Sequence, residues 1–378
     1  MTTEQNSDTI NRRGFLACGG TAAVLAGLAT AQAGAQDAAA PAAEKKLRVA
    51  VLSQWHPHAK GYAKSLSSMP EVDITAVWDE DPKRGEAWAK QLKAPFEADL
   101  AVLLKRGDVD AVCVNAPTSM HPEIMIAAAK AGKHIFTEKV MALTVAECDK
   151  ISAAVRDAGV KFCISFPFRT RVETLYAKKA VEEGLLGKLT FIRVRVAHDG
   201  GCGGWLPEHF WDPATCGGGA MMDLGAHPMY LLRWLGGQPK RVVSAFSSLL
   251  GKPVEDNAVS VIEFENACLG VAETSFVSTR SPFSLELSGT EGSLLVGGPE
   301  EQSVRICSNK LDDKSWHTPA DIPAAGPNPL RLWVEALVKN GPIPFGTEDG
   351  TQLTELMENA YIAAREKRQV EIPPRQAV

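Results

Sequence analysis

Apolar and polar residues follow two successive patterns along this chain. From Leu47 onward, short apolar runs separate longer segments in which apolar residues recur with helical spacing. The runs predict strands at 47–52, 73–78, 109–115, 133–137 and 160–165, and the segments predict helices at 62–68, 82–92, after Met120 and at 145–158. This alternation is typical of a Rossmann-like, doubly wound parallel sheet. We therefore expect a first domain over residues 47–165.

The pattern changes after Ser165, where residues begin to alternate with a period of two. A predicted helix at 172–183 is followed by strands at 189–198, 241–246, 258–264, 267–277, 285–289 and 293–296, and by helices at 329–339 and 350–366. Several strands without long helices between them favour an antiparallel sheet. The expected fold class is α/β, with a C-terminal α+β domain over residues 166–378 that holds a large open, mostly antiparallel sheet.

The first residues predict export. Arg12-Arg13 precede an apolar, alanine-rich run that ends in Ala31-Gln32-Ala33 and Ala33-Gly34-Ala35. Twin arginines followed by such a run and by A-x-A sites are typical of a twin-arginine signal peptide. The apolar run is shorter than a bilayer span, which argues against a stable membrane anchor. We expect a signal over 1–35, a linker over 36–46, and transport by the Tat machinery to the periplasm.

Composition narrows the function classes. The chain has 378 residues, 45% of them hydrophobic, a net charge of −5 and a pI near 6.0. These values suit a soluble two-domain enzyme and argue against a nucleic-acid partner. The eight cysteines have no paired spacing and no H-E-x-x-H motif is present, so no metal is expected. Cys202 and Cys216 flank one loop and either form a bridge or act as small buried apolar residues.

Two segments carry candidate chemistry. A short apolar run ends on Glu138 and Lys139, beyond the carboxyl end of a predicted parallel strand, where ligands bind in such sheets. Later, three glycines open a predicted helix in which Asp223 and His227 lie four residues apart on one face. An imidazole held near a carboxylate can take a proton from an alcohol. The alternative is an acid–histidine pair on a solvated helix surface.

Together, Glu138-Lys139 and Asp223-x-Gly225-x-His227 resemble the Glu-Lys-Pro and Asp-x-Gly-x-His motifs of the Gfo/Idh/MocA family (glucose-fructose oxidoreductase, inositol dehydrogenase, rhizopine catabolism). The resemblance covers residues 47–365, and Val140 replaces the family's proline, which puts the shape of that loop in question. It implies hydride transfer between NAD, with NADP as the other option, and a secondary alcohol of a sugar or sugar derivative. His227 would accept the hydroxyl proton, Lys139 would stabilise the alkoxide, and Asp223 would orient substrate or imidazole. The family's second sheet also implies a homo-oligomer.

The expected cofactor contacts begin in the loop after the first strand. Ser53, Trp55, His56 and His58 occupy the place of G-x-G-x-x-G, whose glycines are all missing. The helix start can still bind a pyrophosphate, while the alternative is that His56 and His58 cap or pack that helix. Asp79 ends the second strand and is the candidate for the ribose hydroxyls, or caps the helix before Pro82. Arg84 could offset its charge and admit NADP.

The resemblance also assigns further contacts. Asn115, Pro117, Thr118, His121 and Glu138 would lie along the cofactor, with a helix-start role as the alternative for His121. Substrate contacts are expected from Arg169, Trp205, His209 and Trp211, with His198 as an additional candidate. Indole faces stack on sugar rings, but the same tryptophans can serve as packing residues.

Export restricts the mechanism, because no free nicotinamide pool is expected outside the cytoplasm. We therefore expect a tightly retained cofactor. One alternative is an NAD-dependent glycoside hydrolase that works by transient sugar oxidation and elimination and restores its cofactor in each cycle. The other is a non-enzymatic carbohydrate-binding relic, which the missing glycines and Val140 favour and the presence of Lys139, Asp223 and His227 opposes.

Overall fold

The computed structural model describes residues 46–298 and 303–375. The predicted export signal over 1–35, and all of the predicted linker except Lys46, lie outside the described residues. Among the described residues, no helix combines the length and the apolar character that a bilayer crossing requires.

Five buried apolar runs form the first sheet, and they confirm the predicted Rossmann-like fold. The strands are β1 (Leu47–Leu52), β2 (Val72–Trp78), β3 (Ala111–Val114), β4 (His134–Thr137) and β5 (Phe162–Ile164). All neighbours pair in parallel, in the order β2-β1-β3-β4-β5. Because the chain crosses from β2 at one edge to β3 on the other side of β1, the topological switch point lies between β1 and β3.

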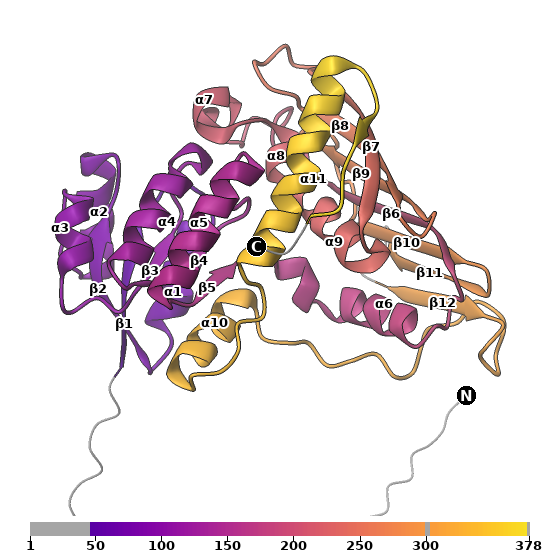
Figure 1. Ribbon diagram of the computed structural model, residues 1–378, viewed down its shortest axis with the longest axis horizontal. Helices are drawn as coiled ribbons and strands as arrows, with labels where there is room; N and C mark the ends of the chain where they lie inside the picture. Colours follow the sequence, from indigo (N-terminus) through magenta and orange to yellow (C-terminus); the bar gives the residue numbers. More distant parts are fainter. Residues whose placement is uncertain (1–45, 299–302, 376–378) are drawn as a thin grey trace, which may run out of the picture. The chain divides into compact units, whose positions relative to one another are not determined.

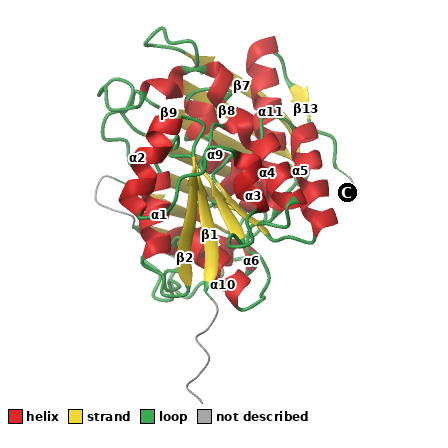
Figure 2. Ribbon diagram, turned by 90° about the vertical axis from the view of Figure 1, so that its left-hand side faces the viewer, coloured by secondary structure: helices red, strands yellow, loops and turns green. Residues whose placement is uncertain are grey.

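Helices cover both faces of this sheet, with α1 and α2 on one side and α4 and α5 on the other (Figure 2). They are α1 (Ala59–Ser67), α2 (Pro82–Leu92), α3 (Leu100–Lys105), α4 (His121–Lys130) and α5 (Val145–Ala158). Local sequence sets their starts: Asp81 and Asp99 cap α2 and α3, and Thr144 forms a capping box with Glu147 at α5. The sequence pattern did not predict α3, which has only six residues.

The second sheet has eight strands and is mostly antiparallel, as expected. It contains β6 (Leu189–Ala197), β7 (Pro239–Ser247), β8 (Asn257–Phe264), β9 (Leu269–Ser275), β10 (Ser284–Gly289), β11 (Gly292–Gly297), β12 (Val304–Ser308) and β13 (Val370–Glu371). The order is β12-β11-β10-β6-β9-β8-β7-β13, with β6–β9 as the parallel pair. The sequence pattern missed β12 and β13.

Helices pack on the face of this sheet that is turned toward the first domain (Figure 1). They include α6 (Val172–Glu182), the short α8 (Ala220–Asp223), α9 (Ala226–Gly236) and α11 (Thr347–Glu366), whereas the short α7 (Pro213–Cys216) contacts residues Thr118–Met120 of the first domain. The helix α11 contacts both α5 and β7, and α10 (Pro329–Val338) returns to the first sheet and packs on β1 and β5. Helices from the C-terminal part of the chain therefore pack on both sheets. The domain boundary at residue 165 stays a prediction.

Candidate active site

Three loops of the first domain meet at the switch point. They follow β1, β3 and β4, and backbone hydrogen bonds join them: the His56 N–H donates to the Asn115 carbonyl (3.1 Å) and the Glu138 N–H to the Val114 carbonyl (3.2 Å). Since the carboxyl ends of parallel strands share one edge, this brings His56, Asn115 and Glu138 together although they lie far apart in the sequence.

Lys139 reaches from this edge to the second domain. Its Nζ lies 2.6 Å from Oδ1 of Asp223, at the end of α8, and 3.1 Å from the Asp223 carbonyl. The Lys139 side chain is only 2% exposed. Burial opposes both charges, but the Asp223 and Glu138 carboxylates raise the pKa of Lys139, and the Lys139 ammonium holds the pKa of Asp223 well below its ordinary value. The pair is therefore charged and joins the two domains.

His227 lies in the first turn of α9. The single helix expected across Asp223 and His227 is wrong: α8 ends at Asp223 and α9 begins at Ala226, because the Gly225 N–H bonds back five residues to the Ala220 carbonyl. The Tyr230 hydroxyl lies 3.0 Å from His227 Nδ1, so Tyr230 fixes the imidazole, not Asp223 as one expected role had it. Burial, and next the Lys139 ammonium, hold the pKa of His227 well below its ordinary value.

These groups line one hollow of about 280 Å³. His56, His58, Lys139, Asp223 and His227 face it from the first domain and from the α8–α9 segment, and the rest of its lining comes from Pro57, His198, Trp205, Leu206, Pro207, Phe210 and Leu224. Acid, base and ammonium groups thus surround a space open to a small molecule.

Some of the predicted substrate residues line this hollow, and others lie elsewhere. Trp205 lines it, is 57% exposed, and donates its indole N–H to Asp199. His198 lies beside Trp205, with ring centroids 4.6 Å apart. Trp211 is buried edge-on against Phe276, which matches the packing role left open for it.

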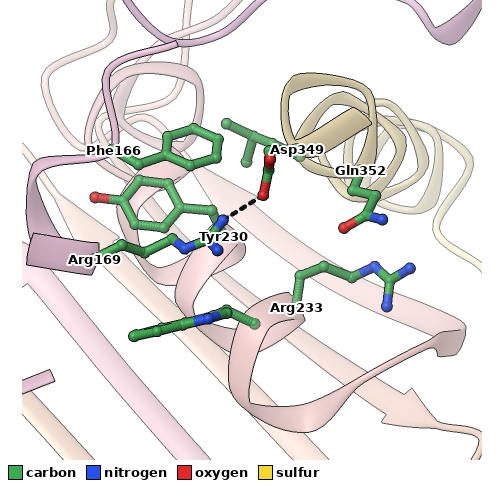
Figure 3. Close-up of a pocket in the computed structure, with 8 residues that line it drawn as sticks. Phe166, Arg169, Tyr230, Arg233, Asp349 and Gln352 are labelled. Atoms are coloured by element: carbon green, nitrogen blue, oxygen red, sulfur yellow. Dashed lines mark hydrogen bonds and ion pairs between the residues drawn. The ribbon is translucent and has the colours of Figure 1, made fainter. Parts of the chain in front are cut away.

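Arg169 lies in a different hollow, of about 210 Å³ (Figure 3). It forms an ion pair with Asp349 on α11, and Arg233 lines the same space. The Tyr230 ring faces this second hollow while its hydroxyl contacts His227. Arg169, which was expected to contact the substrate, therefore does not line the first hollow. It lies in the second hollow, beside Tyr230, the residue that positions His227.

The loop after β1 differs from a phosphate-binding loop in its hydrogen bonds. Each of its N–H groups donates within the chain: Ser53 to the Trp78 carbonyl (2.7 Å), Gln54 to Asp79 (2.8 Å), Trp55 to Ser53 Oγ (3.0 Å), His56 to the Asn115 carbonyl (3.1 Å) and His58 to His56 Nδ1 (3.1 Å). Ser53 has φ of 69°, a left-handed conformation that favours the glycine of the usual motif. A pyrophosphate therefore meets no free N–H group between Ser53 and His58 in this conformation.

Side chains also fill the space beside this loop where a pyrophosphate would lie. The Trp55 ring stacks on Phe210 of the 3₁₀-helix η3 (Glu208–Trp211), with centroids 5.5 Å apart, and the His209 ring lies 4.7 Å from Trp55. Only about 20 Å³ remains between Trp55, Phe210 and Thr118. His209 therefore packs on the loop after β1.

Asp79 lies at the tip of β2, as expected, but its side chain is fully buried. It accepts hydrogen bonds from the Gln54 and Asp81 N–H groups and from the Arg84 guanidinium. Asp81, not Asp79, caps α2, so the alternative capping role of Asp79 is wrong. Arg84 offsets the Asp79 charge, as the sequence suggested.

The structure has room for the two ends of a dinucleotide that runs along the carboxyl edge of the first sheet. Beyond β2, a hollow of about 470 Å³ is lined by Trp78, Ala98, Asp99, Leu100, Met120, Glu123 and Ile124, a size and place suited to an adenosine. At the other end, Thr118 and Lys139 lie beside His56. Between these ends the Trp55–Phe210 stack must open to admit the pyrophosphate.

The remaining predicted cofactor contacts support the backbone. Asn115 is buried and donates to the Cys113 carbonyl, and Pro117 precedes the 3₁₀-helix η1 (Thr118–Met120). His121 is buried between the carbonyls of Ala116 and Val140. It holds the loop after β4, where the Lys139–Val140 peptide is cis although Val140 replaces proline.

The Glu138 carboxylate forms hydrogen bonds with side chains that the sequence did not predict as its partners. His58 Nδ1 lies 2.8 Å from Glu138 Oε1, the Tyr62 hydroxyl donates to the same oxygen, and Ser165 Oγ lies 2.8 Å from the Tyr62 hydroxyl. Burial opposes ionisation, but His56 and His58 hold the pKa of Glu138 well below its ordinary value. Tyr62 follows His58 by one helical turn, a spacing that could have identified it.

Cys202 and Cys216, for which a bridge was left open, are both free thiols. Cys216 is buried and Cys202 is exposed.

Comparison with known proteins agrees with this architecture. Residues 47–166 match a family model described as "Oxidoreductase family, NAD-binding Rossmann fold", and residues 174–295 match "GFO/IDH/MocA C-terminal domain". The scyllo-inositol 2-dehydrogenase (NAD(+)) of Bacillus subtilis is 30% identical over 261 residues, which cover 66% of this chain and 73% of that protein.

Two further relatives show the breadth of the group. The 2,7-anhydro-N-acetylneuraminate hydratase of Mediterraneibacter gnavus is 26% identical over 62% of this chain and 66% of its own length. The crystal structure of GenD2 from gentamicin A biosynthesis in complex with NAD is 26% identical, with a TM-score of 0.75 over 87% of this chain and 97% of that chain. On this evidence the chain is an enzyme of the Gfo/Idh/MocA oxidoreductase family, with that family's NAD-binding Rossmann domain.

Proposed function

We propose that this protein is an exported, NAD-dependent oxidoreductase that acts on a secondary alcohol of a sugar or sugar derivative and retains its cofactor between turnovers. One observation carries the proposal: Lys139, Asp223 and His227 line a single hollow at the carboxyl edge of the Rossmann sheet. A proton acceptor and a cationic donor around one small-molecule space are the groups that alcohol oxidation requires.

When bound, NAD supplies the hydride acceptor. His227 accepts the hydroxyl proton through Nε2, since Nδ1 faces the Tyr230 hydroxyl, and burial and the Lys139 ammonium keep the imidazole neutral by lowering its pKa. Lys139 stabilises the alkoxide oxygen as it forms. Asp223 holds Lys139 in place through the 2.6 Å ion pair, so its role is to position the ammonium.

We assign substrate recognition to aromatic residues that line the same hollow. Trp205 offers an exposed indole face and His198 a polar ring at the same hollow. An aromatic face with adjacent polar groups suits the apolar face and the hydroxyls of a sugar ring.

Export and retention support each other. The twin-arginine pattern at Arg12-Arg13 predicts passage of the folded protein, with its cofactor, to the periplasm. The Trp55–Phe210 stack would have to open for a dinucleotide to enter or to leave, which would slow the release of the cofactor.

Assembly into a homo-oligomer is part of the proposal. Val243, Val259, Val261 and Leu269 are each more than a third exposed on one face of the second sheet, opposite the face that α9 and α11 contact. Exposed apolar residues that gather on one sheet face mark an interaction surface.

A redox-neutral reaction is the second candidate. One relative is named as a hydratase of an anhydro sugar, a reaction without net oxidation. The same groups could serve a glycoside hydrolase in which transient oxidation acidifies a neighbouring C–H bond and elimination follows. The products separate the two candidates: an oxidised or reduced sugar, or a cleaved glycoside.

The first test identifies the cofactor and then the base. Mass spectrometry of the nucleotide released from denatured protein should find stoichiometric NAD, and a screen of sugars and glycosides should then find turnover. His227→Ala should lower kcat by at least about 100-fold and leave nucleotide retention intact. Unchanged kcat in His227→Ala would contradict the proposed base, and an empty protein that also fails to bind added NAD would favour the carbohydrate-binding relic.

A further inference from the structure

A cluster of metal-ligating side chains lies beside the reacting groups and has no part in the proposed transfer. It consists of His56, His58 and Glu138, whose ligand atoms all lie within 4.8 Å of one another. His58 Nδ1 is 2.8 Å from Glu138 Oε1. The sequence analysis predicts no metal, because two histidines at i and i+2 and a glutamate eighty residues later match no closely spaced motif.

The cluster has the surroundings of a built site. His56 is 6% exposed and Glu138 is 2% exposed. His56 Nε2 is buried and makes no hydrogen bond with any of the described residues, the Asp223 carboxylate being 3.9 Å away. A buried ring nitrogen without a partner is costly, and a ligand at this position would remove that cost.

Neighbouring groups hold the ligands in place. The Tyr62 hydroxyl and the Lys139 N–H both donate to the Glu138 carboxylate, and Asp223 faces the His56 ring. Hydrogen bonds of this kind orient metal ligands and set their basicity. The charge of Lys139 is offset by its ion pair with Asp223.

We propose that His56, His58 and Glu138 bind one divalent transition-metal ion, with Zn²⁺ as the best match. Two imidazoles and a carboxylate suit Zn²⁺ and similar ions, and three protein ligands leave a position for a further oxygen. His56 and His58 line the 280 Å³ hollow, so that oxygen belongs to water or to a hydroxyl of the sugar.

Metal binding also has a consequence for the loop after β1. His56 Nδ1 now accepts the His58 N–H at 3.1 Å. If the metal takes Nδ1, that hydrogen bond is displaced, and if it takes Nε2, Nδ1 carries the proton and can no longer accept. Either way the His58 amide loses its acceptor and should exchange its hydrogen faster in the metal-bound protein.

The test uses the full chain without an affinity tag, stripped with a chelator and titrated with Co²⁺ as a spectroscopic stand-in for Zn²⁺. We expect one equivalent bound, with the d–d absorption of a nitrogen–oxygen site. His58→Gln and Glu138→Gln should each weaken binding at least about tenfold. The His58 side chain is 52% exposed, so its replacement leaves the core intact.

His317→Gln is the matched control, because it removes a histidine that pairs with a carboxylate, Asp313, outside the cluster at 3.6 Å. It should bind Co²⁺ as the wild type does, and so should His227→Ala, which separates this site from the proposed proton transfer. Absence of binding in the wild type, or equal affinity in His58→Gln, would overturn the proposal.

Discussion

The Lys139 ammonium acts on two neighbours at once. It holds Asp223 in its charged form and, after burial, is the main influence that keeps His227 neutral. A base whose pKa lies well below its ordinary value remains unprotonated until the pH falls below that lowered pKa. We therefore expect kcat/KM to be constant from neutral pH to below the ordinary histidine value of about 6.5 and to fall only at lower pH.

Removal of the positive charge tests this coupling. In Lys139→Met, the Asp223 carboxylate loses its partner and the pKa of His227 should rise, so the acid limb of kcat/KM for the residual activity should move to higher pH. Lys90→Met, an exposed lysine on α2, should leave the profile in place. An acid limb at the same pH in Lys139→Met and the wild type would show that Lys139 does not tune His227.

The sequence predicted which residues meet at the 280 Å³ hollow better than it predicted their partners. Lys139, Asp223 and His227 were identified from two short motifs, because strand ends and helix starts are local features. Phe210 as the partner of Trp55 arises only when the loop after β1 packs against η3, which lies far away in the sequence. Tyr230, by contrast, follows His227 by three residues on α9, a spacing that places both side chains on one helix face and could have identified it.

At the scale of elements, the break between α8 and α9 places the site. The first residues of α8 are anchored to Glu255: its carboxylate accepts the Gly219 and Met221 N–H groups and the Tyr361 hydroxyl. A Cβ at Gly219 would lie 2.0 Å from the Glu255 carbonyl oxygen. Only glycine lets the backbone approach this closely.

Gly219→Ala should therefore destabilise the fold by about 1–3 kcal/mol, the usual cost of overpacking. Thermal and denaturant unfolding measure this change. Gly61→Ala in α1 is the control, since nothing lies within 4 Å of the added Cβ and helix propensity improves; its stability should be unchanged or higher. Equal stability of Gly219→Ala and the wild type would mean that α8 is free to shift.

Several elements were predicted with bounds close to those observed, and some short ones were missed. The strand 47–52 and the helices 82–92 and 145–158 have the predicted ends because apolar periodicity and capping residues agree there. By contrast, α3 and β13 have six and two residues, which is too short for a period to be recognised. Their formation depends on the neighbours against which they pack.

At the scale of the whole molecule, the exposed face of the second sheet is the surface that the proposed homo-oligomer would bury. Val243 and Val261 are directly paired across β7 and β8, and ion pairs of Arg241 with Glu263 and of Arg193 with Glu273 flank them. An apolar centre with a charged rim is the arrangement that protein interfaces favour. A charge placed at the centre should therefore separate the subunits.

Val261→Arg makes that change at a position that is already 41% exposed, so the fold can accommodate the new side chain. We expect the wild type to sediment as an oligomer and Val261→Arg as a monomer, because an unpaired buried charge costs several kcal/mol per subunit contact. Val338→Arg, 52% exposed at the end of α10, a helix that packs on the first sheet, should keep the wild-type mass. A monomeric wild type, or an oligomer that survives Val261→Arg, would contradict assembly through this face.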